Sequence, residues 1–334
     1  MKLKQILIAV LMLALLVPTL TACDACTQDG DYDFTIGILS GSRIPAFELG
    51  APGFQERLTE LMAAEGLTVR FDNQNALGDE TTAVTIAQNF AAQRVDLMFV
   101  LGTTASQNAL PVATNADIPL VFGIITDPVG AGIISDISTG SSSALPMVTQ
   151  VDLLAELTGA ELSAENRVAF LYTTDEDNSV ASLGRLQAAA PADTIVPFGI
   201  PANGLDHLIQ HFINIAADPT ISAIYIPQDN QITRDMGMVQ NLNRSQNDDR
   251  RLPIVVADLP IVADGAVASL SVDFAGNGAA AADIAFDILV NGIWPETFYA
   301  PAVEELSLYI NATEAAYIDF EIPATLVERA TRTF

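Results

Sequence analysis

The chain has 334 residues, half of them hydrophobic, so it can form one large domain or two of ordinary size around buried cores. Its formal net charge of −27 at pH 7 repels nucleic acid and anionic lipid, which argues against both as partners of its surface. The only two lysines are Lys2 and Lys4, so the rest of the chain cannot supply a Schiff-base lysine or a phosphate-loop lysine.

The N-terminus has the pattern of an export signal. A short basic start precedes an apolar stretch that is shorter than the ~20 residues of a membrane span and suits a signal peptide. Leu20-Thr21-Ala22-Cys23 then resembles the bacterial lipobox, in which the cysteine is lipidated and becomes the new N-terminus. We therefore predict a signal peptide at residues 1–22, a lipid on Cys23 and a tether at residues 23–32.

Cys23 and Cys26 also have the spacing of a redox pair or of half a zinc site. A redox pair needs a thioredoxin-like strand-to-helix context, and a zinc site needs two more Cys or His ligands nearby. The sequence has neither, so the lipobox interpretation is favoured. We expect an exported protein held at the cell membrane by its lipid, facing the periplasm or the outside, because no basic patch could bind the membrane.

From residue 34 onward, short apolar runs alternate with longer helical patterns. Strands are expected at Phe34–Leu39, Leu67–Phe71, Asp96–Leu101 and Leu120–Ile125, and helices at Gly53–Glu65, Thr81–Gln93 and Ser106–Thr114. This alternation predicts βαβ units and a parallel sheet. The strands are apolar on both faces, as a sheet covered on both sides requires.

A Ser- and Gly-rich stretch, Ser138–Pro146, is predicted to cross between two lobes, because the alternation starts again after it. Strands are then expected at Arg167–Tyr172, Thr194–Phe198, Ala223–Ile226, Pro253–Val256 and Val267–Val272, and helices at Val151–Leu157, Ala181–Ala190, Leu205–Ala216, Gln231–Asn241 and Asn277–Val290. Two successive α/β halves of similar size predict two lobes.

Polar segments follow the predicted strands. They are Ser40–Arg43, Gly102–Gln107, Thr126–Pro128, Thr173–Ser179, Pro227–Asn230 and Ala257–Pro260. Ligands of parallel α/β sheets bind at the carboxyl ends of the strands, where the helices begin. Each segment alone could simply cap a helix. Six of them together favour a shared cleft that hydrogen-bonds a small polar molecule.

These segments belong to longer motifs spread over nearly the whole chain. The motifs are QNALGD (Gln74–Asp79), IAQNFAAQRVDLMF (Ile86–Phe99), TTASQNA (Thr103–Ala109), PLVFGIITDPVGAG (Pro119–Gly132), DEDNS (Asp175–Ser179), YIPQDN (Tyr225–Asn230), DGAVASLSVDF (Asp264–Phe274) and FEIPATLVERA (Phe320–Ala330). As a set and in this order, they resemble a family of ABC-transporter solute-binding lipoproteins, some members of which bind tryptophan or tyrosine.

The resemblance implies an α/β fold of the type I periplasmic-binding class. In that fold two lobes, each a parallel sheet flanked by helices, are joined by three hinge crossings and close on the ligand. By the family's pattern, residues 33–146 and 268–298 form the N-lobe, and residues 147–267 and 299–330 form the C-lobe. Gly78 and Asp79 are interpreted as structural, with the glycine in a turn and the aspartate as a helix N-cap.

The resemblance also implies a set of ligand-binding residues. They are Ser42, Thr103, Thr104, Ser106, Gln107, Asp127, Asn178, Ser179, Asp229, Asn230 and Asp258. We expect a ligand ammonium group on Asp229 or Asp258 and a ligand carboxylate at the helix start of Thr103 and Thr104. Asp229→Asn is then predicted to weaken binding without lowering the melting temperature.

The chain departs from the family in its first loop. Ile44-Pro45 stands where members often have His-Pro, and Arg43 is adjacent. Phe47 and Phe274 are candidate partners for an aromatic ligand ring.

The resulting prediction is the extracytoplasmic solute-binding component of an ABC importer. It would be a monomer without cofactor or metal that delivers an amino acid to permease and ATPase subunits. A lipid-anchored sensory receptor of the same fold is an alternative, and a lipoprotein enzyme is another, although no nucleophile–base pair is visible. His207 and His211 could hold a metal with a third ligand, but their helix has an apolar stripe typical of packing.

Overall fold

The computed structural model describes residues 32–202, 204, 206–294 and 306–334. Within these ranges, no helix is both long enough and apolar enough to cross a membrane. The predicted signal peptide and the predicted lipid site at Cys23 lie outside the described residues, and both stay predictions.

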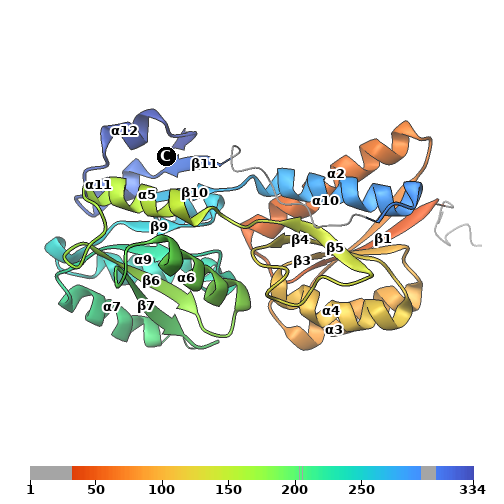
Figure 1. Ribbon diagram of the computed structural model, residues 1–334, viewed down its shortest axis with the longest axis horizontal. Coiled ribbons are helices and arrows are strands. Elements are labelled where there is room, and N and C mark those ends of the chain that lie inside the picture. The colour runs from red at the N-terminus through yellow and green to blue at the C-terminus, as the bar shows by residue number, and fades with distance from the viewer. Residues whose placement is uncertain (1–31, 203, 205, 295–305) are drawn as a thin grey trace, which may run out of the picture. The chain divides into compact units, whose positions relative to one another are not determined.

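The first sheet has five parallel strands in the order β2-β1-β3-β4-β5. They are β1 (Phe34–Ser40), β2 (Val69–Asn75), β3 (Leu97–Leu101), β4 (Leu120–Ile125) and β5 (Ser138–Ser142). Helices α2 (Pro45–Ala64) and α10 (Phe274–Phe286) cover one face, and α3 (Glu80–Gln93) and α4 (Thr103–Ala116) cover the other (Figure 1). A π-helical turn, η3 (Asp287–Asn291), extends α10. We call this sheet with its helices the first lobe.

The second sheet has seven strands in the order β12-β11-β10-β9-β8-β6-β7, and all neighbours are parallel except β10 and β11. The strands are β6 (Arg167–Thr173), β7 (Ile195–Ile200), β8 (Ile221–Ile226), β9 (Ile254–Val256), β10 (Ala268–Ser271), β11 (Ser307–Ile310) and β12 (Arg332–Thr333).

Helices cover both faces of the second sheet as well. One face packs against α5 (Met147–Thr158), α6 (Asp177–Ala189), α11 (Ala312–Tyr317) and α12 (Ala324–Glu328), and the other against α7 (His207–Ala217) and α9 (Met236–Arg244). The short helices are α8 (Asn230–Arg234) after β8, η1 (Asp248–Arg250) before β9 and η2 (Leu259–Asp264) after β9. This sheet with its helices is the second lobe.

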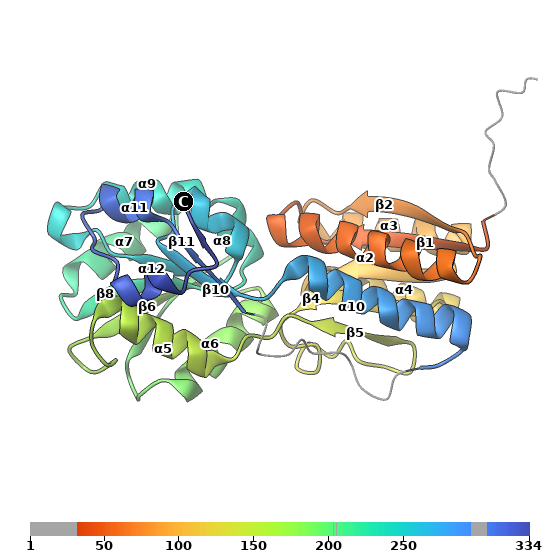
Figure 2. The ribbon, with the colours of Figure 1, turned by 90° about the horizontal axis from the view of Figure 1, so that it is seen from above.

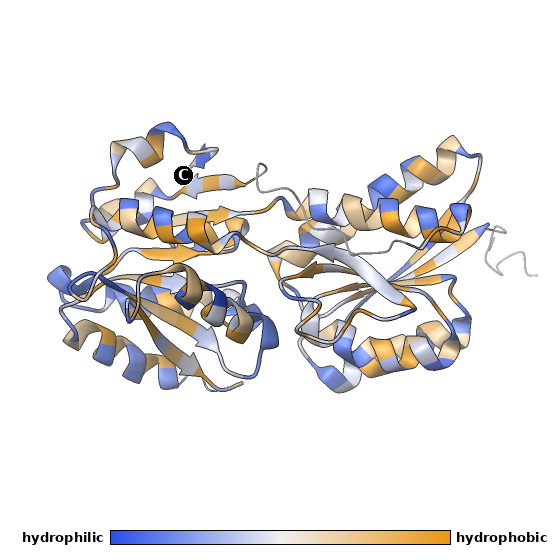
Figure 3. Cartoon of the chain, viewed as in Figure 1, coloured by the Kyte–Doolittle hydropathy of each residue, from blue (hydrophilic) through white to orange (hydrophobic). Residues whose placement is uncertain are grey.

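The cores explain the apolar runs of the sequence. All residues of β3 and β4 are buried, so these strands are apolar without alternation, as expected of a parallel sheet covered on both sides. On the α2 side, the Phe54 ring stacks on the Phe99 ring, with centroids 3.9 Å apart and planes 8° apart. Figure 3 shows hydrophobic strands between helices that alternate hydrophobic and hydrophilic residues.

Helices α2 and α10 lie side by side along the first sheet although they are far apart in the sequence (Figures 1 and 2). Their close approach depends on glycine. A Cβ on Gly278 would lie 2.0 Å from the Gly50 carbonyl oxygen, and a Cβ on Gly53 would lie 2.3 Å from the Ala275 carbonyl oxygen. The chain thus returns from the second lobe to complete the first.

The α/β class with two helix-flanked, mainly parallel sheets is confirmed, but the structure differs from the sequence analysis in one linker. The first five residues of Ser138–Pro146 form β5, a fully buried strand, so the crossing is confined to residues 143–146. Gly140 is required there, because a Cβ would lie 2.1 Å from the Phe122 carbonyl oxygen. The Ser141 hydroxyl donates to Asn277, which satisfies a polar group inside the first lobe. A buried strand without bulky side chains therefore looks like a linker in the sequence.

Two further boundaries differ. β10 is hydrogen-bonded to β9, so residues 268–271 lie in the second sheet and the predicted first-lobe segment starts one strand too early. The helix expected at Gln231–Asn241 is two helices, α8 and α9, separated at Asp235. The other predicted lobe boundaries stay predictions.

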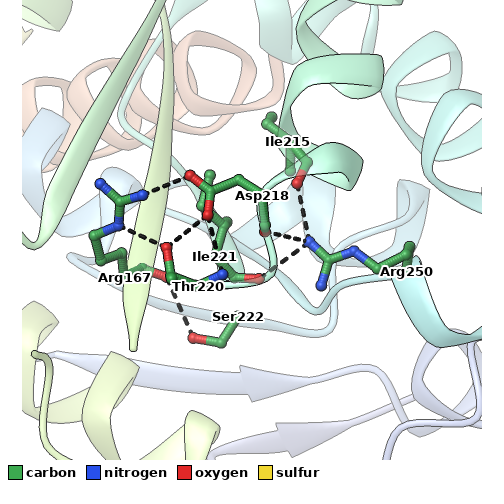
Figure 4. A network of polar contacts seen from close by, with 7 residues as sticks. All are labelled: Arg167, Ile215, Asp218, Thr220, Ile221, Ser222 and Arg250. Carbon is green, nitrogen blue, oxygen red and sulfur yellow. Dashed lines mark hydrogen bonds and ion pairs between the residues drawn. The ribbon is translucent and has the colours of Figure 1, made fainter. Parts of the chain in front are cut away.

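A network of hydrogen bonds and ion pairs connects the amino ends of β6 and β8 (Figure 4). The Asp218 carboxylate accepts from the backbone N–H and the hydroxyl of Thr220 and pairs with Arg167. Arg250 donates to the carbonyl oxygens of Ile215 and Asp218. Because Arg167 begins β6 and Thr220 precedes β8, this network lies at the edge opposite to the polar loops that follow the strands. Two arginines are thus engaged away from those loops.

Candidate ligand-binding site

A cavity of about 160 Å³ lies at the carboxyl ends of the strands and is lined by both lobes. We call it the outer cavity. The polar residues of its wall are Ser42, Asp79, Glu80, Thr103, Thr104 and Asn108 from the first lobe, and Thr173, Asp175, Glu176, Asn230, Gln231 and Arg234 from the second. This placement agrees with the rule that parallel sheets bind ligands where their strands end.

A second cavity of about 20 Å³ shares part of its wall with the first, through Phe47, Gly102, Thr103 and Asn230. We call it the inner cavity. Its remaining wall is formed by Ile44, Ala46, Ile124, Thr126, Asn178, Gln228, Asp258 and Phe274. A space of this size admits a group about as large as one water molecule.

The start of α4 forms the shared wall. Gly102 is the N-cap, with φ +97°, and no side chain caps the helix there. A Cβ on Gly102 would lie 2.6 Å from Cζ of Phe47, so only glycine lets the Phe47 ring pack against this turn. The first backbone N–H groups of α4 have no partner within the helix, and such groups favour an anion.

Six of the eleven predicted ligand-binding residues line the cavities. They are Ser42, Thr103, Thr104, Asn178, Asn230 and Asp258. Phe47 borders both cavities, and Phe274 borders the inner one, whereas Arg43 is exposed and borders neither. The polar loops thus converge as the sequence analysis expected, although not every member reaches the cavity.

Four other predicted residues line neither cavity. Gln107 donates to Asp177 of the second lobe at 2.8 Å and to the Ala131 carbonyl. Asp127 accepts from the Gly130 N–H at 2.9 Å within its own turn. The Ser179 hydroxyl donates to Asp229 at 2.8 Å. The Ser106 hydroxyl is buried without a hydrogen-bond partner, and it lines neither cavity.

Asp229 is the eleventh, and its carboxylate is fully used by the protein. It is 1% exposed and lines neither cavity. Its oxygens accept from the Thr173 N–H at 2.6 Å, the Thr173 hydroxyl at 2.9 Å, the Ser179 hydroxyl and the Ile232 N–H at 2.8 Å. Burial raises the pKa of Asp229, and these bonds oppose that effect. The geometry leaves Asp229 no free acceptor for a ligand ammonium group.

Asp258 has the opposite environment. It is 3% exposed, and its Oδ2 accepts one long hydrogen bond of 3.3 Å from the Thr233 hydroxyl. Its Oδ1 is buried without a partner, and the residue lines the inner cavity. Burial raises the pKa of Asp258 to about 7, and the nearby charge of Asp229 acts in the same direction.

Several residues of the cavity walls were not among the predicted ligand contacts, and Glu176, Arg234 and Gln228 are three that matter for the chemistry of the site. Burial, and after it the Asp229 charge, raise the pKa of Glu176 to about 7, while the N–H groups of Asn230 and Gln231 donate to its carboxylate. Arg234 is the one cationic side chain among the described residues that line either cavity. Gln228 lines the inner cavity from the segment Pro227–Asn230. Its position in a polar segment after a strand was the available sequence signal.

Hydrogen bonds also join the two lobes beside the inner cavity. Oε1 of Gln228 accepts from the Thr126 hydroxyl at 2.9 Å and from the Ser143 hydroxyl at 3.0 Å. Arg185 of α6 donates to the Thr126 carbonyl at 3.0 Å. Gln228 therefore belongs both to the contact between the lobes and to the cavity wall.

The described residues contain no group of three or more His, Cys, Asp or Glu side chains that could hold a metal ion. His211 is engaged in packing, because its Nε2 contacts the Gly199 carbonyl at 2.9 Å and its ring meets the Phe198 ring edge-on. The cavity walls offer hydroxyl, amide and carboxylate groups next to an aromatic ring. Such an arrangement can hold a small molecule with both hydrogen-bond donors and acceptors.

Two α/β lobes with a polar cavity at their strand ends define an α/β solute-binding protein of the type I periplasmic-binding class. The family model described as ABC transporter substrate binding protein matches residues 36–334. The chain therefore belongs to the ABC transporter substrate-binding protein family. Proteins of this family are extracytoplasmic, bind small ligands and work with ABC permease components. Their fold is that of solute-binding proteins and not of enzymes.

Similar proteins are known in several bacteria. A curated relative, the tyrosine-binding protein of Clostridioides difficile (strain R20291), is 25% identical over 266 residues, which cover 78% of this chain and 74% of the relative. The solved structure of an ABC domain from Streptococcus pneumonia in complex with L-Trp has a TM-score of 0.76 and 25% identity, covering 90% of this chain and 100% of that one. A conserved domain protein of Vibrio cholerae has the same TM-score and identity, with 90% and 99% coverage.

Proposed function

We propose that this protein captures a single amino acid between its lobes and delivers it to the permease of an ABC importer, with an aromatic amino acid as the preferred ligand. The observation that carries the proposal is the chemistry of the cavity walls. The uncapped start of α4 at Thr103 suits a carboxylate, and the Asp258 carboxylate suits a cation. Thr103 borders both cavities and Asp258 borders the inner one, so the two charged groups of an amino acid would bind on either side of the shared wall.

The size of the site supports a small ligand. The outer cavity of about 160 Å³ is smaller than the ~300–1,000 Å³ of pockets for drug-sized ligands. A single amino acid is therefore favoured over a peptide or an oligosaccharide.

Phe47 borders both cavities and therefore supports a ligand with an aromatic side chain. A ring–ring contact adds about 0.5–1.5 kcal/mol beyond the burial of apolar area. The relatives named for tyrosine and for L-Trp point to the same ligand class.

The proposal includes the cellular arrangement expected from the sequence. The protein would be a monomer that is exported, lipidated at Cys23 and held near permease and ATPase subunits by its tether. Support comes from the lipobox-like Leu20–Cys23 and from the family. Intact-mass analysis of membrane-extracted protein tests the lipid, since an unmodified Cys23 thiol contradicts it.

A thermal-shift screen of the twenty amino acids, nucleosides, sugars and polyols tests the ligand class. A ligand that binds only the folded state adds about 2.7 kcal/mol of stability at a hundredfold excess over its Kd. We expect tryptophan or tyrosine to raise the melting temperature by several degrees, followed by a 1:1 isotherm in titration calorimetry. Stabilisation by a sugar or polyol, with none by any amino acid, would reject the proposal.

A further inference from the structure

Among the described residues that line the inner cavity, three buried polar atoms have no hydrogen-bond partner. They are Oδ1 of Asp258, Oδ1 of Asn178 and Nε2 of Gln228. A buried polar atom without a partner loses the hydrogen bonds that water would give it, so three together mark a place built for a ligand group. Building on the proposed capture of an amino acid, we propose that the inner cavity is the subsite for a primary ammonium group. The protein then accepts zwitterionic α-amino acids and rejects their deaminated forms and neutral polyols.

The neighbours of the two amides determine which amide atoms are left without a partner. Oε1 of Gln228 accepts from the hydroxyls of Thr126 and Ser143, which leaves Nε2 as the unpaired donor. Nδ2 of Asn178 donates to the Gln228 carbonyl at 2.6 Å, which leaves Oδ1 as the unpaired acceptor. With Oδ1 of Asp258, the cavity therefore offers two acceptors and one donor.

This set of atoms discriminates between ligand groups. An ammonium group has three donors and no acceptor, so it can satisfy Asp258 and Asn178 together. A hydroxyl donates only one hydrogen bond and leaves one of the two acceptors unpaired. A ligand with a carboxylate but no ammonium group would place a second anion beside Asp258. An α-amino acid carries a carboxylate next to its ammonium group, and this carboxylate can accept from the remaining donor, Gln228.

The charges around Asp258 favour a cationic group. It is the one ionisable side chain among the described residues that line the inner cavity. Asp229, on the neighbouring strand end, is a second buried carboxylate, and Glu176 of the outer cavity is a third. Arg185 of α6 donates to the carbonyl of Thr126, which also lines the inner cavity, and it forms no ion pair with Asp258.

The other described side chains that line the inner cavity are uncharged, and the cation of α8, Arg234, lines the outer cavity and pairs with Asp235 at 3.7 Å. Thr233 of α8 donates one hydrogen bond to Asp258. Phe274 of α10 and Ile44 ahead of α2 line the cavity with apolar groups. A carboxylate in these surroundings is poorly solvated until a cation pairs with it.

Occupation of the subsite should therefore exchange a proton for the ligand. Burial raises the pKa of Asp258 to about 7, so part of the empty protein carries a proton there at neutral pH. When the ammonium group enters, the Asp258 carboxyl loses this proton to solvent and the carboxylate pairs with the ammonium group. The apparent affinity should then be about tenfold weaker at pH 6 than at pH 8, because the proton competes with the ligand below the pKa.

The experiment uses three probes for each ring in titration calorimetry at pH 8. For the indole ring they are tryptophan, 3-(indol-3-yl)propionate without the amine, and tryptamine without the carboxylate; for the phenol ring they are tyrosine, 3-(4-hydroxyphenyl)propionate and tyramine. We expect an amino acid to bind and its deaminated partner to bind at least 100-fold more weakly. Binding of both within threefold overturns the ammonium subsite but leaves the amino-acid function intact. Binding of the amine alone supports the subsite and overturns the function, and binding of none overturns both.

Variants test the same subsite from the side of the protein. Asp258→Asn keeps the shape and removes the charge, and we expect at least tenfold weaker amino-acid binding and loss of the pH dependence between pH 6 and pH 8. Asp264→Asn is the matched control, because Asp258 is the N-cap of the short helix η2 and Asp264 is the exposed last residue of that helix. It should keep the affinity and the pH dependence of the wild type. Equal affinity and equal pH dependence of Asp258→Asn and the control would contradict the proposal even if all variants fold.

Discussion

Asp229 and Asp258 follow neighbouring strands of the same sheet, β8 and β9, and both side chains are almost fully buried. Asp229 accepts four hydrogen bonds from the protein, whereas Asp258 accepts one long bond and keeps Oδ1 unpaired at a cavity. Burial alone therefore does not distinguish a structural carboxylate from one that can bind a ligand. The number of donors that the protein already supplies does distinguish them.

The largest expected effect comes from removing the structural carboxylate. Asp229→Ala leaves the N–H groups of Thr173 and Ile232 buried without an acceptor. We expect a loss of about 3–5 kcal/mol in the free energy of unfolding, because each unpaired buried group costs roughly 1–3 kcal/mol. Urea denaturation measures it. A loss below about 1 kcal/mol would mean that Asp229 is not structural, and the contrast with Asp258 would then be wrong.

Asp258→Asn should change stability in the opposite direction at high pH. The folded-state pKa of Asp258 is raised to about 7 from an ordinary value near 3.8, so this group lowers stability progressively as pH rises from about 4 to 7. Removing its charge should stabilise the empty protein on the order of 2 kcal/mol at pH 8 and little at pH 4. Melting temperatures of both proteins from pH 4 to pH 8 measure this. A variant that is less stable at pH 8 would show that Asp258 is structural after all.

A smaller effect is expected from one donor to Asp229. Ser179→Ala removes a hydroxyl that donates to this carboxylate at 2.8 Å, and we expect a loss of about 1–2 kcal/mol in the free energy of unfolding. Ser182→Ala is the control on the same helix, because the Ser182 hydroxyl donates only to the Asn178 carbonyl one turn back. Equal losses in the two variants would mean that the bond to Asp229 stabilises the fold no more than an ordinary hydroxyl bond within a helix.

The smallest effect is expected from the single donor to Asp258. Thr233→Val removes a hydrogen bond of 3.3 Å, which is long, so stability should fall by less than about 0.5 kcal/mol. The lost bond also opposed the rise of the Asp258 pKa, so this pKa should move further upward. Amino-acid binding at pH 7 should then weaken by no more than about threefold. A tenfold loss would show that Thr233 contributes more to the site than its geometry indicates.

Much of the fold follows from sequence patterns, because parallel strands buried on both faces leave continuous apolar runs. The runs at β3 and β4 located both strands within one residue. The interpretation of Asp79 as an N-cap is confirmed by its bond of 2.6 Å from the Thr82 N–H, and Gly78 has the positive φ of a turn. β5 was missed because its Ser, Thr and Gly residues are buried through hydrogen bonds and close backbone packing that leave no hydrophobic pattern.

The site was predictable as a set of loops and less so as individual contacts. Asp229 and Asp258 both follow an apolar strand in a polar segment, and nothing local in the sequence shows which one faces a cavity. The difference arises from Thr173 and Ser179, which lie about fifty residues earlier and reach only Asp229 in the fold. Gln228 is similar, since its contact to Thr126 comes from the other lobe and its contact to Ser143 from the crossing between the lobes.

The pairing of α2 with α10 also determines when the first lobe can complete its folding. Roughly 210 residues separate the end of α2 from the start of α10, so joining them closes a very long loop. Strands β1 to β10 all precede α10, and until α10 has been synthesised the apolar face of α2 lacks its cover. The growing chain thus exposes hydrophobic surface for most of its synthesis, a state in which chaperones commonly protect proteins from aggregation.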